Sequence, residues 1–207
     1  MGHYVRSKNA GVVVCLLAIS VLVYSCGDST ASGNDPGLLV EQGWEEFNLN
    51  KFPVALQNFE RALESDPNHA GAHLGAGWMN ARLGNLESAQ SHFEATVTNG
   101  NEKERLDGSA GKSVVDLALG TYSDAVTHAQ LALGVGSSED GPGAYSFEHS
   151  VNMDAPSLNL VRAQAHFLLG EYGDAIRVLQ FLDDDVSLTD SNPKEIAKGI
   201  AALYGAN

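Results

Sequence analysis

The residues with the chemistry to do more than pack are a Gly-Lys-Ser triplet, seven histidines and the aspartate run 183–185. Gly111, Lys112 and Ser113 stand in the order that ends a phosphate-binding loop, in which backbone amides and the lysine hold phosphate groups. That loop needs another glycine five residues before Gly111, where this chain has Leu106. No strand pattern precedes the triplet either, so we expect no nucleotide to bind there.

Metal binding and acid–base catalysis have no supporting pattern. His69 and His73 are four residues apart but lie at the junction of two expected helix pairs. No histidine has the spacing of a helical zinc motif, and residues 183–185 lack the alternating oxygen ligands of a calcium loop. We therefore expect the histidines on solvated faces, and neither catalysis nor a bound metal or cofactor.

The N-terminus has the charge pattern of an export signal. Arg6 and Lys8 precede an uncharged stretch, residues 10–25, which is shorter than the about 20 residues of a membrane span. Ser25 and Cys26 at its end resemble the lipobox of bacterial lipoproteins, although Tyr24 stands where a small residue is usual. The resemblance implies a signal peptide at 1–25 and lipidation of Cys26. An uncleaved anchor helix and a plain cleaved signal are the alternatives, and each places the remaining chain outside the cytoplasm.

The chain is strongly acidic. Residues 1–25 carry two basic and no acidic residues, so their removal changes the net charge from −14 to −16. Such a body repels phosphate backbones and anionic lipid headgroups, which excludes nucleic acid as an expected partner. Residues 26–36 are small, polar and rich in turn formers, which is typical of a flexible tether. Attachment to a membrane would then depend on the lipid.

A short phrase recurs four times in the rest of the chain, and each copy ends in an alanine. The alanines are Ala55, Ala89, Ala125 and Ala175, at spacings of 34, 36 and 50 residues. A helix-ending residue stands five positions before each of them: Asn50, Gly84, Gly120 and Gly170. A small residue stands twelve positions before: Gly43, Gly77, Ser113 and Ala163. Apolar residues four and seven positions after most of the alanines keep one helix face inward.

This pattern resembles the tetratricopeptide repeat family, whose unit is a helical hairpin of 34 residues. The resemblance implies an all-α protein, an α-α superhelix of about four helical hairpins with a C-terminal capping helix. Its expected parts are units one to three at 37–133, an insertion at 134–156, a divergent fourth unit at 157–183 and the capping helix at 191–205. The insertion alternates apolar and aromatic residues from Tyr145 to Met153, so we expect that half to be extended and to pack on the solenoid.

In this family the first helix of each hairpin lines a concave wall. The positions that face it are Val40, Trp44, Phe47, Leu74, Trp78, Arg82, Val114 and Leu117. We expect these mostly apolar residues to form a groove for a partner, with Trp44 and Trp78 within about 10 Å of each other and partly exposed. The alternative is that tight curvature of the solenoid, or the insertion, covers the wall.

These features together imply a lipid-anchored, non-catalytic scaffold of the bacterial cell envelope that binds another envelope protein or a peptide segment. The alternative is a component of an envelope assembly machine, similar to the lipoprotein of the barrel-assembly complex. Gly27 follows Cys26 where an aspartate commonly retains lipoproteins in the inner membrane. The resemblance therefore favours an outer-membrane location that faces the periplasm.

Overall fold

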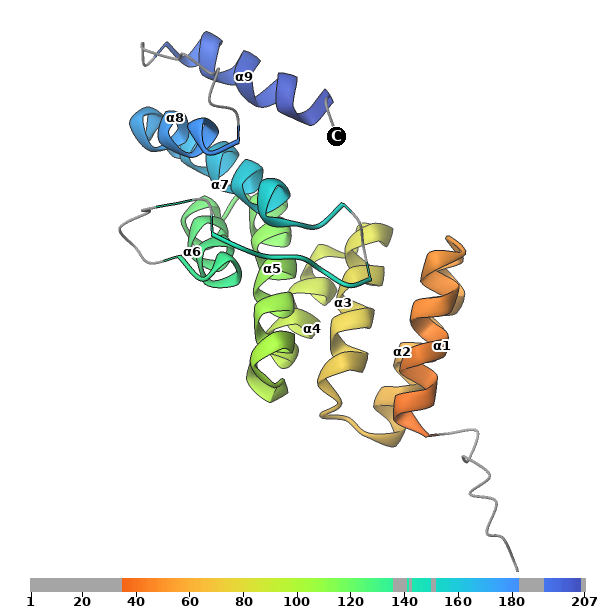
Figure 1. Cartoon of the computed structure of the whole chain (residues 1–207). Coiled ribbons are helices and arrows are strands. Elements are labelled where there is room, and N and C mark those ends of the chain that lie inside the picture. The colour runs from red at the N-terminus through yellow and green to blue at the C-terminus, as the bar shows by residue number, and fades with distance from the viewer. Residues whose placement is uncertain (1–34, 136–140, 142, 150–151, 183–191, 206–207) are drawn as a thin grey trace, which may run out of the picture. The chain divides into compact units, whose positions relative to one another are not determined.

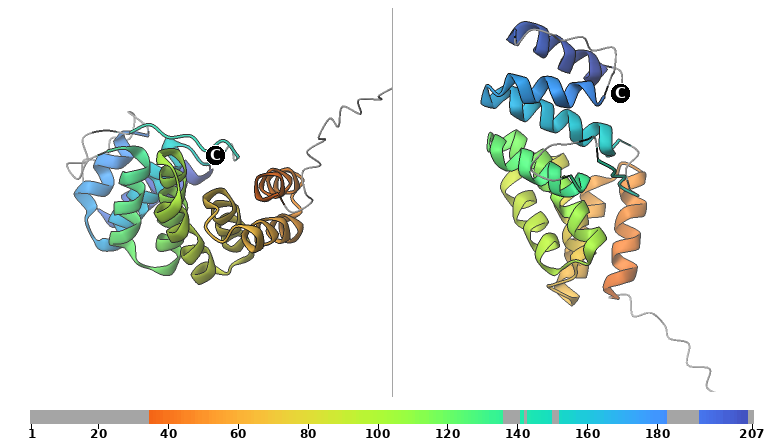
Figure 2. Two further views of the ribbon diagram at one scale, coloured as in Figure 1. Left: turned by 90° about the horizontal axis from the view of Figure 1, so that it is seen from below. Right: turned by 60° about the vertical axis from the view of Figure 1, so that its left-hand side comes forward.

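The fold is a stack of helical hairpins. The computed structural model describes residues 35–135, 141, 143–149, 152–182 and 192–205. The hairpins are α1 (Pro36–Asn48) with α2 (Phe52–Ser65), α3 (Ala70–Leu83) with α4 (Leu86–Asn99), α5 (Glu102–Leu119) with α6 (Tyr122–Leu133), and α7 (Ala155–Leu169) with α8 (Tyr172–Gln180), and α9 (Pro193–Gly205) follows them. Consecutive helices pack against one another, and so do the first helices of neighbouring hairpins (Figures 1 and 2). The part of the chain that the structure describes is thus an all-α superhelix of hairpins.

Some of the predicted features lie outside the described residues. Among them are the signal-like stretch 1–25, Cys26 and the aspartate run 183–185. Within the described ranges, none of the helices combines the length and the hydropathy required to cross a membrane.

The elbows of the four hairpins have the predicted geometry. Gly84, Gly120 and Gly170 end their helices at φ angles of 82°, 85° and 79°, and Asn50 has a φ of 58°. This left-handed region suits glycine and asparagine, because other side chains are strained there. The recurring phrase therefore marks the turn between the two helices of each hairpin.

Aromatic rings fill the space between the first three hairpins. Phe59 and Phe93 are fully buried, and each lies between two glycines of neighbouring first helices. The pairs are Gly43 and Gly75 around Phe59, and Gly77 and Gly111 around Phe93. At the equivalent repeat positions the third hairpin has Ala129 in place of the phenylalanine, and Ser113 and Val161 in place of the two glycines, all of them buried. The smaller central side chain thus coincides with larger residues at the two glycine positions, as dense packing requires.

The end of the stack is covered by α9. Ile196 and Ile200 are buried against Leu160 of α7 and against Val178 and Leu179 of α8, with Leu203 half-buried beside them. The helix α7 begins at Ala155, inside the range expected for the insertion. The Asp154 side chain accepts a hydrogen bond from the Ser157 amide at 2.9 Å and so caps the helix there.

Candidate functional site

The described residues of the insertion lie across the first helices of the stack, as the teal trace in Figure 1 shows. We call its residues 144–149 and 152–154 the strap. The Phe147 amide donates to the Met153 carbonyl at 2.9 Å, and the Ala155 amide donates to the Tyr145 carbonyl at 3.0 Å. The strap is therefore a narrow antiparallel loop. The expectation of one continuous extended run from Tyr145 to Met153 was wrong, because the chain turns back after Phe147.

Phe147 is the residue that joins the strap to the helices. Its ring centroid lies 5.8 Å from that of Trp44 on α1 and 5.5 Å from that of Trp78 on α3. The exposed fractions are 5% for Phe147, 6% for Trp44 and 9% for Trp78. The expectation of partly exposed tryptophans was therefore wrong, and the alternative, that the insertion covers the wall, describes this structure.

Most of the predicted wall residues come together around this ring. Leu74 is buried in the same cluster as Trp44 and Trp78, and Val40, Phe47 and Val114 pack against it half-buried. Leu117 does not belong to this cluster. It lies nearer the turn of its hairpin and packs with Val126 of α6 and Ala165 of α7. The prediction that Leu117 lines the same surface as the tryptophans was therefore wrong.

The edge of the wall carries Arg82. Its guanidinium carbon lies 6.0 Å from the ring centroid of Phe47 and 5.8 Å from that of Phe52. Next to it is an open cavity of about 260 Å³, lined by Phe47, Asn48, Asn50, Phe52, Arg82, Glu148 and His149. Glu148 and His149 of the strap thus line a partly polar space that the strap does not fill.

A polar cluster of four side chains holds the strap to α5. The Tyr145 hydroxyl donates to Asp107 Oδ1 at 2.8 Å, and Lys103 Nζ lies 2.9 Å from Glu148 Oε2 and 3.4 Å from Asp107 Oδ2. Burial raises the pKa of Asp107, while the hydrogen bond from Lys103 lowers the pKa of Glu148. Sequence reasoning missed Asp107. The signal was its position seven residues before Val114, which places both on the face of α5 that lines the wall.

His149 extends the aromatic contact. Its imidazole stacks on Trp44 at 3.9 Å between centroids, with an angle of 2° between the planes. Burial lowers the pKa of His149, which favours the neutral ring in this stack. Tyr145, Phe147 and His149 therefore place three rings of one short segment on the helices.

Each elbow is closed by a pair of polar side chains five residues apart. The distances between the paired side-chain atoms are 3.0 Å from Lys51 Nζ to Glu46 Oε2, 3.2 Å from Asn85 Nδ2 to Asn80 Oδ1, 3.2 Å from Thr121 Oγ1 to Asp116 Oδ1 and 2.7 Å from His166 Nδ1 to Glu171 Oε2. In every pair the amide of the second residue also donates to the carbonyl of the first. The chemistry differs from hairpin to hairpin but the position does not, so these pairs lock the turn.

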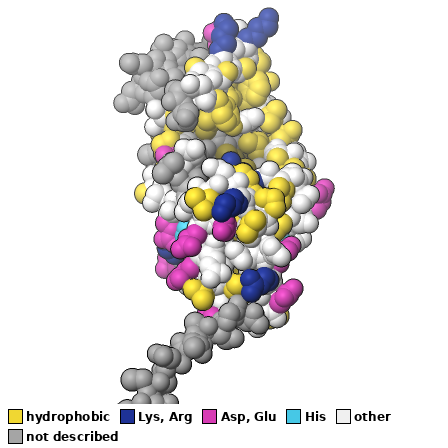
Figure 3. All heavy atoms as spheres, turned by 90° about the vertical axis from the view of Figure 1, so that its right-hand side faces the viewer, with side chains coloured by type: hydrophobic (Ala, Val, Ile, Leu, Met, Phe, Trp, Pro, Cys, Tyr) yellow, Lys and Arg dark blue, Asp and Glu magenta, His cyan; other side chains and the backbone are white. Residues whose placement is uncertain are grey.

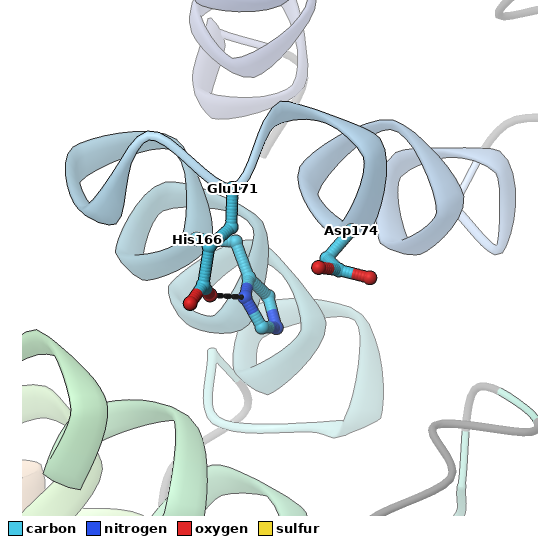
Figure 4. Close-up of side chains that lie close together, drawn as sticks. All are labelled: His166, Glu171 and Asp174. Carbon is cyan, nitrogen blue, oxygen red and sulfur yellow. Dashed lines mark hydrogen bonds and ion pairs between the residues drawn. The ribbon is translucent and has the colours of Figure 1, made fainter.

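One such pair belongs to a cluster with metal-ligand chemistry. The side chains of His166, Glu171 and Asp174 offer ligand atoms within 4.8 Å of one another (Figure 4). An imidazole and two carboxylates are donors that suit a divalent cation such as Zn²⁺. His166 and Glu171, however, occupy the elbow position, and Asp174 lies 2.7 Å from Arg177. The pairing of His166 with Glu171 at the turn and the ion pair of Asp174 with Arg177 within α8 therefore explain why these side chains lie close together, and no metal is needed to explain it.

The other chemistry-bearing residues pack within helices. Gly111, Lys112 and Ser113 lie in the middle of α5, where Ser113 Oγ donates to the Ala110 carbonyl at 2.7 Å and Lys112 pairs with Glu94. They form a helix rather than a loop.

The expectation of solvated histidines was wrong for several of them. His73 and His92 pair through their Nδ1 atoms at 3.0 Å, and His128 Nδ1 lies 2.6 Å from Asp116 Oδ2. His166 is buried. These rings make polar contacts between helices or across an elbow, so they belong to the packing of the stack.

On one face of the molecule the types of exposed side chain differ along the stack. On the face that Figure 3 shows, hydrophobic side chains gather in the upper half, which is the α9 end in Figure 1, and acidic side chains lie mainly in the lower half. The acidic half carries the hairpins that hold the strap.

Comparison with known proteins gives the same fold. Residues 40–104 match the tetratricopeptide repeat family. A tetratricopeptide repeat protein from Parabacteroides merdae ATCC 43184 has a TM-score of 0.58 and 18% identity over 86% of this chain, which spans 60% of that protein. The MamA protein has a TM-score of 0.58 and 12% identity, covering 84% of this chain and 90% of its own. TTC0263, a thermophilic protein of this type from Thermus thermophilus, has a TM-score of 0.54 and 22% identity, covering 83% and 82%. Curated protein sequences give no match.

Proposed function

We propose, on the premise that this chain is a solenoid of tetratricopeptide-type hairpins, that it is a non-catalytic scaffold that binds another protein through its concave wall. We propose further that a lipid on Cys26 tethers it to the bacterial cell envelope. The observation that carries the binding role is that the wall holds an extended segment, the strap, with Phe147 inserted between Trp44 and Trp78.

The physical argument for binding is the chemistry of the wall. Two indoles at an apolar surface offer a large contact area for aromatic or aliphatic side chains, which are the usual anchors of protein interfaces. Stacked hairpins also present such a wall over several repeats, which suits a long partner segment. The same wall without the strap would be a groove open to a partner segment, with no change in the helices.

The argument for the envelope comes from the sequence. It consists of the basic N-terminus, the uncharged stretch 10–25, the Ser25-Cys26 junction and the polar tether after it. One lipid-modified end gives attachment that the acidic body cannot provide by charge. Gly27 after the cysteine supports an outer-membrane location that faces the periplasm.

The binding role is tested by site-specific photo-crosslinking in cells. A photo-reactive residue at Arg82, on the exposed edge of the wall, should capture one discrete protein from envelope fractions. The same residue at the exposed Ser123 on α6 is the matched control and should not capture it. Identical bands from both positions would show non-specific contact and contradict the role of the wall.

The anchor is tested by labelled palmitate. We expect the wild-type chain and Cys15→Ala to incorporate the label, and Cys26→Ala to lose it. Equal labelling of Cys26→Ala and the wild type would contradict lipidation at this cysteine.

A further inference from the structure

We propose that the strap is an exchangeable occupant of the wall, displaced by an extended partner segment with the pattern aromatic–any–aromatic–acidic. The strap has this pattern itself, as Tyr145, Ser146, Phe147 and Glu148. The inference rests on the proposed function, because it specifies the partner of the same wall. Three observations carry it: how the strap is held, what it leaves unsatisfied, and which charges it neutralises.

The strap is held to the helices by side chains. Among the described residues, its backbone hydrogen bonds join Phe147 to Met153, Tyr145 to Ala155, and Ala144 to the end of α6 at Leu133. The contacts to α1, α3 and α5 include the rings of Phe147 and His149, the Tyr145 hydroxyl and the Glu148 carboxylate. The side chains of Tyr145 and Met153 also pack against the buried apolar clusters of these helices. Another extended segment with equivalent side chains therefore fits without any change in the helices.

The strap leaves a buried donor without a partner. Trp78 Nε1 is buried and has no hydrogen-bond acceptor among the described residues. A buried N–H without an acceptor loses its bond to water and gains nothing in return. The backbone carbonyl of an extended segment is the acceptor that such a groove most readily receives. A segment that supplies it satisfies a group that the strap does not, which gives a competitor its advantage.

The charges around the strap select an acidic residue after the second ring. Glu148 faces Lys103 at 2.9 Å, and when the strap leaves, Lys103 keeps only Asp107 at 3.4 Å. Arg82, beside the open cavity, contacts only aromatic rings among the described residues. Two cations then border the vacated wall, and a carboxylate in the partner pairs with one of them.

The test uses the full chain and a synthetic peptide of residues 143–155. In the double variant Tyr145→Ser with Phe147→Ser the strap keeps only the His149 ring of its three, so we expect tryptophan emission to shift to the red. The peptide added in trans should restore the blue-shifted emission. A peptide with alanine in place of Phe147, or with lysine in place of Glu148, is the matched control and should bind at least about tenfold more weakly. The wild-type chain should also bind the peptide at least about tenfold more weakly than the double variant, because its tethered strap competes at high effective concentration.

A second measurement keeps the inference testable if the double variant fails to fold. In the intact wild type, the Phe147 amide proton should exchange with solvent at least about tenfold faster than the Met79 amide proton in α3. The reason is that the strap opens while the helices stay folded. Exchange of both amides at the same rate would mean that the strap leaves only on global unfolding, and would overturn the inference. A double variant that folds but does not bind the peptide would overturn it too.

Two other outcomes separate this inference from the proposed function. If light scattering shows that the wild type is a dimer in which the strap of each copy lies on the wall of the other, the occupant of the wall is a second copy of this chain. This result would overturn the proposal of a separate partner. If Arg82 captures a partner while the strap amides stay protected from hydrogen exchange, the scaffold role is supported. The proposal that a partner displaces the strap is then overturned.

Discussion

Glycine at position 77 is required by the Phe93 ring beside it. A Cβ atom at Gly77 would lie 2.7 Å from Phe93 Cε1, closer than van der Waals contact permits. We expect Gly77→Ala to lower the free energy of unfolding by about 1–3 kcal/mol, the usual cost of overpacking. Urea unfolding followed by circular dichroism measures it.

The control for this change is Gly173→Ala in α8. Gly173 is exposed and has no atom within 4 Å of a Cβ. Alanine there should raise stability by about 0.5–1 kcal/mol, because it removes the entropic cost of glycine in a helix. Equal effects at the two positions would contradict the account of the ring packing.

The paired histidines make stability depend on pH. His73 Nε2 donates to the Pro67 carbonyl at 3.0 Å, so its Nδ1 accepts from His92 in the neutral pair. Burial, and then the charge of His73, lowers the pKa of His92 below 6.5. The unfolded chain therefore binds this proton more readily, and the free energy of unfolding should fall as the pH drops below about 6.5.

Urea unfolding at about pH 7.5 and about pH 5.5 checks this, since the two values bracket the unfolded pKa. Burial lowers the pKa of His149 as well, so it adds to the loss, whereas the raised pKa of Asp107 acts in the opposite sense at more acidic pH. We expect a smaller loss in His92→Gln. A variant with the pH dependence of the parent would rule out His92 as a source.

At the scale of elements, the elbow of the third hairpin depends on Asp116. Its buried carboxylate accepts from Gln90 at 3.0 Å and Thr121 at 3.2 Å, and contacts His128 Nδ1 at 2.6 Å. Asp116→Ala leaves these groups without their acceptor, so we expect a loss of about 1–3 kcal/mol in the free energy of unfolding. Glu64→Ala, at an exposed position at the end of α2, should change it by less than about 0.5 kcal/mol. Similar losses in both variants would show that the contacts of the Asp116 carboxylate do not cause the loss of stability.

The terminal helix α9 closes the last hairpin. Ile196 and Ile200 are buried against α7 and α8, and full burial of each contributes about 1.5–3 kcal/mol. A chain that ends at Asp190 should melt at a lower temperature and aggregate, because it exposes Leu160 and Leu179. A chain that ends at Gly205 retains α9 and serves as the control. Equal melting temperatures for the two chains would mean that α9 does not stabilise the stack.

At the scale of the whole molecule, intrinsic fluorescence reports the state of the wall, since Trp44 and Trp78 are the only tryptophans of the chain. The free protein should emit as a buried indole and resist acrylamide quenching. Phe147→Ala should shift the emission to the red and allow quenching, because it removes the ring between them. Phe167→Ala removes an equal ring near α9 and should leave the emission unchanged. Ready quenching of the wild type would contradict a covered wall.

Much of the fold could be predicted because repeats encode it locally. The left-handed turns at Gly84, Gly120 and Gly170 follow from residue type and spacing, since few residues other than glycine adopt that conformation without strain. The wall positions of Trp44 and Trp78 follow from the register of the repeat. Leu117 shows the limit of this reasoning. Its register matched the wall, but contacts with α6 and α7 decided where its side chain packs.

The helical hairpins, their number and the face on which the tryptophans lie could be predicted, because these features depend on short-range periodicity. Whether that face is open depends on residues far apart in the chain. Phe147 is more than sixty residues from Trp78 in sequence, and alternation from Tyr145 to Met153 indicates an extended segment without saying where it binds. The strap's position depends on contacts across that distance: Phe147 with two indoles, and Tyr145 with Asp107. No local pattern contains such contacts, since they exist only once the first three hairpins have stacked.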